Sequence, residues 1–120
     1  MAPQSLQLDA DPARALAEIR AASADHPVLI FKKSPICPVS HRAEARYVQW
    51  KEALGAADDI LVADIDVIAE KPLARGLTKQ LGIDHQSPQA LWFVKGELAW
   101  HGSHAELTLA RFDELKSSAQ

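Results

Sequence analysis

The stretch from Val28 to Ser40, VLIFKKSPICPVS, constrains the fold of this chain more than any other. It begins with the apolar run Val28–Phe31, which contains β-branched and aromatic residues, and such a short run is typical of a buried strand. Pro38 follows where a first helical residue is expected, because the N–H that proline lacks would have no partner there. The stretch therefore predicts a buried strand that leads into a helix, with Cys37 near the N-cap of that helix.

Cys37 is the only cysteine of the chain, and its predicted position favours reactivity. Free backbone N–H groups and the positive end of the helix dipole favour the thiolate, which is the nucleophilic form. In the motif Cys37-Pro38-Val39-Ser40, Ser40 stands where a C-x-x-C motif has its second thiol. Its hydroxyl can donate a hydrogen bond to the thiolate, but it cannot expel a mixed disulfide. We therefore predict that Cys37 and Ser40 are catalytic and that an outside thiol completes the cycle.

Composition narrows the possible partners and location. At 120 residues, the chain is most simply a single domain over residues 1–120. The net charge of −3 gives no reason to expect a nucleic acid or an anionic membrane as partner. No apolar run approaches the roughly 20 residues of a membrane-spanning helix, and the N-terminal residues lack the layout of a secretory signal. A single cysteine excludes an internal disulfide, so we expect a cytoplasmic, reducing location.

The order of predicted elements is α-β-α-β-α-β-β-α. After a loose lead-in over residues 1–10, a helix is predicted from Pro12 to about Ala24, with Asp11 as its cap. A strand at 28–33, a helix Pro38–Leu54, a strand Asp59–Val67 and a helix opening at Pro72 follow. The chain then has a hairpin of Gln89–Lys95 and Leu98–His101 around Gly96-Glu97, and a last helix starting at Ser103. A parallel βαβ unit followed by a hairpin and a helix predicts a thioredoxin-like α/β fold. Its mixed four-stranded sheet would carry helices on both faces, with Cys37 at the carboxyl end of the first strand.

Two helices show further patterns that can be checked. In the second helix, a buried face is predicted from apolar residues three or four apart: Val39, Ala43, Tyr47, Trp50 and Leu54. At the start of the last helix, Ser103 and Glu106 form a capping-box pair.

The dipeptide Ser87-Pro88 is the second candidate part of the site, because it immediately precedes the strand that begins at Gln89. In thioredoxin-like folds a cis-proline at this place lies against the active cysteine, and the residue before it offers backbone groups to an extended substrate. We therefore expect a cis Ser87-Pro88 bond and predict that Pro38, Ser87 and Pro88 bind substrate.

Other polar residues near the motif have weaker claims. We expect Lys32 and Lys33 to form a solvated strand end. We also expect His41 to be solvated rather than to assist a thiolate. The histidines do not have the spacing of a zinc site, so we predict no metal and no resident cofactor. Asp64 and Asp66 lie on one face of a strand and are interpreted as structural or solvated.

The chain resembles the monothiol bacilliredoxin family from about residue 10 to residue 115. The resemblance rests on IFKKSPICPVS, on DIDVIAEKPLARGL and on GIDHQSPQALWFVKGELAWHGSH. It implies that Cys37 is the active cysteine, that Pro88 is the cis-proline and that Ser40 leaves the site with one thiol. It also implies that the protein removes bacillithiol, as a low-molecular-weight co-substrate, from S-thiolated proteins. The chain departs from the family pattern in the loop before the cysteine, at Lys33, Pro35 and Ile36.

Two other functions fit parts of the sequence. A thioredoxin-like binding or adaptor module would keep Cys37 as a small, buried and inert residue. An iron–sulfur-binding monothiol glutaredoxin would use a C-x-x-S cysteine as a cluster ligand, but its motif has Gly and Phe where Pro38 and Val39 stand here.

Overall fold

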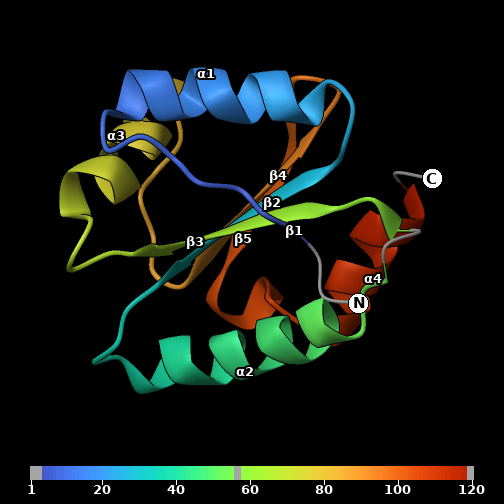
Figure 1. Cartoon of the computed structure of the whole chain (residues 1–120). Coiled ribbons are helices and arrows are strands. Elements are labelled where there is room, and N and C mark those ends of the chain that lie inside the picture. The colour runs from blue at the N-terminus through green and yellow to red at the C-terminus, as the bar shows by residue number, and fades with distance from the viewer. Residues whose placement is uncertain (1–3, 56–57, 119–120) are drawn as a thin grey trace.

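The computed structural model describes residues 4–55 and 58–118 and has three layers, with a β-sheet between two pairs of helices (Figure 1). Helices α1 (Pro12–Ser23) and α3 (Lys71–Leu81) cover one face of the sheet. Helices α2 (Pro38–Glu52) and α4 (Leu109–Ser118) cover the other face. This arrangement is the predicted thioredoxin-like architecture.

The sheet has the strand order β1-β3-β2-β4-β5. Its strands are β1 (Gln4–Ser5), β2 (Val28–Lys33), β3 (Leu61–Asp66), β4 (Gln89–Val94) and β5 (Glu97–Ser103). Strand β3 runs parallel to β1 and β2, whereas β4 is antiparallel to β2 and β5. The four predicted strands thus form the mixed sheet. The lead-in differs from our expectation, because two of its residues add the short parallel strand β1 at the edge.

Strand β2 is the centre of the core, because its side chains are buried on both faces of the sheet. Leu29 and Phe31 pack into the cluster beneath α2 and α4. Val28 and Ile30 alternate with them and pack into the cluster beneath α1 and α3. A strand covered on both faces needs a continuous apolar run, which is what the sequence has at this place.

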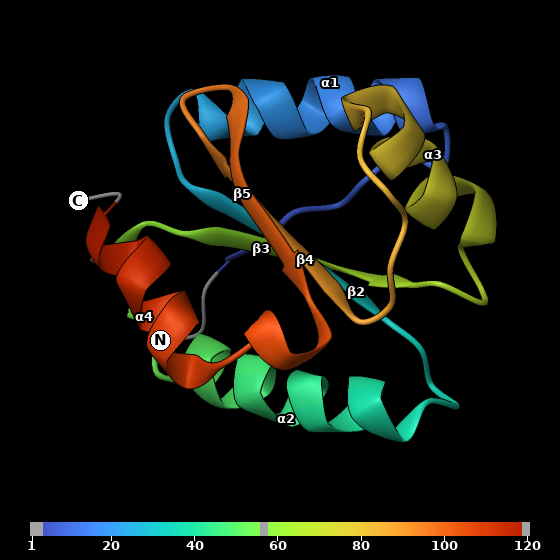
Figure 2. The same cartoon turned by 180° about the vertical axis from the view of Figure 1, so that it is seen from behind.

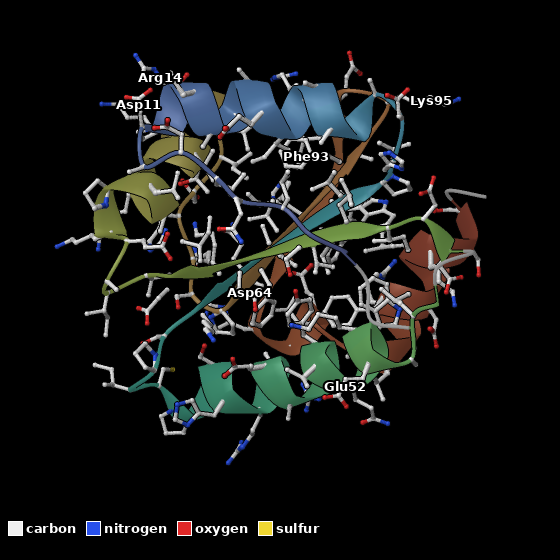
Figure 3. All side chains as sticks on the ribbon, viewed as in Figure 1. Asp11, Arg14, Glu52, Asp64, Phe93 and Lys95 are labelled. Carbon is white, nitrogen blue, oxygen red and sulfur yellow. The ribbon has the colours of Figure 1, made fainter. Side chains whose placement is uncertain are left out.

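The helix boundaries follow the local signals of the sequence. Helix α1 begins after Asp11, whose Oδ2 accepts the backbone N–H of Arg14 (3.0 Å), with Pro12 at the first helical position. Figure 3 labels Asp11 and Arg14 at this start of α1. Helix α3 ends at Gly82, whose φ of 72° is the left-handed conformation that favours glycine.

Three local predictions need correction. Val39 is 43% exposed, because the first turn of α2 extends beyond the sheet, and Ser40 takes the buried position of that turn instead. The hairpin turn has its positive φ angles at Lys95 and Gly96, so it lies one residue earlier than predicted.

The third correction concerns the last helix. The capping box of Ser103 and Glu106 is present, but it begins the 3-10 turn His104–Glu106 rather than the helix itself. Helix α4 starts afresh at Leu109, and the Thr108 hydroxyl accepts the N–H of Arg111 (3.1 Å). Two successive capping side chains therefore divide what the sequence pattern presents as one helix.

Helices α1 and α3 approach each other closely at Gly76. A Cβ atom added there would lie 2.3 Å from Cγ of Pro12, which is too close for any real contact. Pro12 is held at the start of α1 and its ring has little freedom to move away. The small residue at Gly76 thus permits the packing of these two helices.

We expect Gly76→Ala to destabilise the fold by about 1–3 kcal/mol, because the cost of overpacking exceeds the gain in helix propensity. Urea denaturation of the variant would measure this. Gly55→Ala is the matched control, because the nearest atom to a Cβ there is 3.9 Å away. A Gly76→Ala variant as stable as the control would contradict the prediction.

Candidate functional site

Cys37 occupies the N-cap of α2, as the sequence predicts. Its carbonyl accepts the N–H of His41 (3.0 Å), the first hydrogen bond of the helix. The cysteine side chain makes no capping hydrogen bond and is partly exposed. An α-helix leaves its first N–H groups without intrahelical partners, so the positive end of the α2 dipole lies at Cys37. This location is typical of nucleophilic cysteines.

Ser40 is fully buried one turn into α2. Its Oγ accepts a hydrogen bond from the backbone N–H of Ser34 (2.8 Å), in the segment that links β2 to α2. Within the described residues, no hydrogen bond joins the Ser40 hydroxyl to the Cys37 side chain. The observed contact gives Ser40 a structural task, because it holds the segment that carries Cys37. A hydroxyl can accept and donate at once, so donation to a thiolate stays a prediction.

Two further contacts hold the segment before Cys37. The Pro35 carbonyl lies 2.7 Å from Nε2 of His41 and can only accept, so this ring nitrogen carries the proton. Lys33 donates to Oε2 of Glu44 (2.8 Å), and this hydrogen bond raises the pKa of Lys33. Both contacts join the end of β2 to the exposed side of α2.

The Ser87-Pro88 peptide bond is cis, as predicted. Pro88 is buried just before β4, and its carbonyl accepts the N–H of His104 (3.2 Å). Because Gln89 of β4 pairs with Lys32 near the end of β2, this dipeptide lies at the same end of the sheet as the link to α2. Figure 2 shows the loop between α3 and β4 reaching this end. The structure thus brings the two predicted parts of the site to one edge of the sheet.

Lys32 is not at a solvated strand end, and this prediction was wrong. Lys33 is half-buried, but Lys32 is fully buried. Along β2, alternate side chains point to the same face, so Lys32 follows Ile30 toward α1 and α3. The Nζ of Lys32 donates to Oε1 of Gln89 (2.7 Å) and lies 2.7 Å from Nδ1 of His85. The lysine therefore ends in a polar cluster beneath the loop that carries Ser87-Pro88.

This cluster favours a neutral amine. Burial first, and then the positive charge of Arg75 on α3, lower the pKa of Lys32 to about 7. Burial and the charges of Lys32 and Arg75 also lower the pKa of His85. No carboxylate in the described part of the chain forms an ion pair with Lys32. Its two partners match the two N–H groups of an uncharged lysine.

Tyr47 fixes α2 on the sheet. Its ring stacks on Phe31 with 4.4 Å between ring centroids, and its hydroxyl donates to Oδ1 of Asp64 (2.6 Å). Burial and the charge of Asp64 raise the pKa of Tyr47. Figure 3 labels Asp64 between β3 and α2, where it receives this bond. Asp66 accepts backbone N–H groups of the turn after β3, which lowers its pKa. Both carboxylates thus have structural tasks, as expected.

Three large apolar side chains are exposed at this edge of the molecule, and we refer to them as the apolar rim. They are Ile36, Val39 and Ile68, with exposed fractions of 79%, 43% and 52%. Ile36 and Val39 flank Cys37 in the chain. Ile68 follows β3, whose carboxyl end lies beside that of β2 because the two strands are parallel. Exposed apolar side chains around a partly exposed cysteine are suited to contact with another protein.

The comparisons with known proteins agree with this geometry. A family model described as monothiol bacilliredoxin BrxC matches residues 10–112. Among solved structures, a protein described as having a thioredoxin fold superposes with a TM-score of 0.68 at 24% identity, covering 81% of this chain and 83% of that one. Reduced desulfothioredoxin from Desulfovibrio vulgaris Hildenborough has a TM-score of 0.63 at 17% identity, over 98% and 99% of the two chains. Oxidised thioredoxin O2 from Arabidopsis thaliana has a TM-score of 0.67 at 14% identity, over 98% and 93%. These structures establish the thioredoxin fold.

None of the helices in residues 4–55 and 58–118 is long and apolar enough to cross a membrane.

We expect Ser40→Ala to lower the free energy of unfolding by about 1–3 kcal/mol, because it leaves the N–H of Ser34 buried and unpaired. Urea denaturation measures this loss, with the exposed Ser117→Ala as control. If the two variants were equally stable, the hydrogen bond between Ser40 and Ser34 would not contribute to the free energy of unfolding.

The burial of Lys32 predicts a pH dependence of stability. The unfolded chain binds a proton at Lys32 up to the ordinary pKa of 10.5, whereas the folded site releases it near 7. The free energy of unfolding should therefore rise with pH in this window, with a slope from Lys32 of up to about 1.4 kcal/mol per pH unit. Lys32→Met should lose this contribution, and the exposed Lys79→Met should keep it. Parallel stability curves for both variants would contradict the assignment.

Proposed function

The chain belongs to the monothiol bacilliredoxin family, and from this premise we propose that it is a thiol–disulfide oxidoreductase that removes bacillithiol from S-thiolated proteins. The family match supports a thiol redox role. The observation that carries the proposal is Cys37, a partly exposed cysteine at the N-cap of α2 and just beyond the carboxyl end of β2.

The proposed reaction has two exchanges of sulfur–sulfur bonds. In the first, the Cys37 thiolate attacks the bacillithiol sulfur of a protein–bacillithiol disulfide. The sulfur–sulfur bond between bacillithiol and the target protein breaks, and a Cys37–bacillithiol disulfide forms. The target protein leaves as a thiolate that takes up a proton. In the second, an outside thiol attacks the bacillithiol sulfur of this disulfide, so that a disulfide between the outside thiol and bacillithiol forms and Cys37 leaves in its reduced form. The outside thiol supplies the two electrons that the target protein has received.

Ser40 explains why the second exchange needs an outside thiol. A hydroxyl in its position cannot displace a thiol from Cys37. The chain has no second cysteine to do so. The mixed disulfide on Cys37 is therefore an obligatory intermediate rather than a side product.

The target protein would dock at the edge of the sheet that holds both parts of the site. The backbone of Ser87, next to the buried Pro88, would pair with an extended segment of the target. Pro38 and the apolar rim would contact its side chains beside Cys37. A single cysteine suits a reducing compartment, so we place this reaction in the cytoplasm.

Replacing the nucleophile tests the proposal most directly. We expect Cys37→Ser to abolish the release of bacillithiol from a test protein that carries it as a mixed disulfide, because a hydroxyl does not attack disulfides at neutral pH. Mass spectrometry of the wild type should show the Cys37–bacillithiol adduct, and circular dichroism should show that the variant folds.

Three outcomes would overturn the proposal or part of it. Residual transfer by Cys37→Ser would exclude Cys37 as the nucleophile. An adduct with a different small thiol, such as glutathione, would keep the mechanism and exclude bacillithiol as the co-substrate. Slow alkylation by iodoacetamide together with no adduct would instead favour the binding-module alternative.

A further inference from the structure

One buried side chain, Gln89, forms hydrogen bonds with two backbone groups of the loop that carries Ser87-Pro88. Its Nε2 donates to the carbonyl of Asp84 (3.0 Å), and its Oε1 accepts the backbone N–H of Gln86 (3.3 Å). Gln89 is the first residue of β4 and only 2% exposed, so its amide is a fixed point beneath the loop. The conformation of residues 84–88 therefore depends on the orientation of this amide.

Lys32 supports that orientation. The backbone N–H of Gln86 can only donate, so the amide atom it contacts is the oxygen, and the same oxygen accepts a second hydrogen bond from Nζ of Lys32 at 2.7 Å. The nitrogen of the same amide must then face the carbonyl of Asp84. Lys32 also reaches the loop directly, through His85 Nδ1 at 2.7 Å, which accepts only in the neutral ring.

From these contacts we propose that Lys32 is a positioning residue for the loop 84–88, holding it through Gln89 and His85 in the conformation that receives the target protein. This inference rests on the proposed function, which assigns substrate docking to Ser87 and Pro88. Lys32 is 0% exposed and so acts through the loop without touching the substrate. An apolar residue would fill the same place in the core, so the amine is there for its hydrogen bonds.

The charges around Lys32 set the pH range of this arrangement. His85 faces it from the loop and Arg75 from α3, while Gln89 of β4 and Ile65 of β3 are uncharged neighbours. Protonation of His85 removes an acceptor and places two positive charges side by side. The hydrogen-bonded conformation of the loop is therefore stable at neutral and alkaline pH, and it is less stable in acid.

The test compares Lys32→Met and Gln89→Met with the control Lys79→Met, using a test protein that carries a mixed disulfide with bacillithiol. We expect KM to rise about tenfold to a hundredfold in the first two variants, the effect of losing one to two buried hydrogen bonds. The change in kcat should be smaller, and alkylation of Cys37 by iodoacetamide should proceed at the wild-type rate. The double variant should be no worse than either single variant, because both break the same connection.

The outcomes separate this inference from the proposed function. Unchanged KM in both variants, or effects that add in the double variant, would overturn the role of Lys32 while transfer by the wild type still stands. If the wild type transfers no bacillithiol, the proposed function fails, and ¹⁵N amide resonances of residues 84–89 test the loop by themselves. Lys32→Met should shift or broaden them and Lys79→Met should not, whereas unmoved resonances would overturn the inference.

Discussion

The burial of β2 on both faces of the sheet is the constraint on which the rest of the structure depends. Four successive side chains of this strand, Val28–Phe31, are 0% exposed, and each contributes roughly 1.5–3 kcal/mol when fully removed from water. Hydrogen bonding to β3 on one side and β4 on the other fixes the register. The core therefore determines where β2 ends, and Cys37 follows a short segment beyond that end.

The site divides its tasks between an accessible cysteine and a buried framework. Cys37 is partly exposed at the start of a helix, whereas Ser40 is buried and bonded to Ser34. Tyr47 then joins α2 to Phe31 and Asp64 in the sheet. The framework thus holds the start of α2 on the sheet and leaves the cysteine partly exposed.

Apolar packing of the core does not explain why a lysine is buried at position 32. A buried amine without an anionic partner costs stability whenever it is charged, and burial lowers its pKa accordingly. The hydrogen bonds to Gln89 and His85 satisfy the neutral amine and connect β2 with the loop 84–88. The same strand thus determines the position of Cys37 beyond its end and supports the loop 84–88 beside it.

Local signals were sufficient for the order of helices and strands and for the place of Cys37 at the N-cap of α2, whereas the cis-proline was predicted from the fold class. They are carried by neighbours in the chain: Asp11 with Pro12, Gly82 after α3, and the apolar run of β2. They did not predict the second cap at Thr108, which separates the 3-10 turn His104–Glu106 from α4.

The sequence by itself determined the fold class, the single cysteine and the absence of a second thiol, because these depend on residue type and short-range spacing. The tertiary structure alone decided the contacts of Lys32, although alternation along β2 already pointed its side chain inward. Its partners His85 and Gln89 are 53 and 57 residues away in the chain. Contacts at such separations depend on strand register and on how a loop closes over the sheet, and neither is encoded in a local pattern.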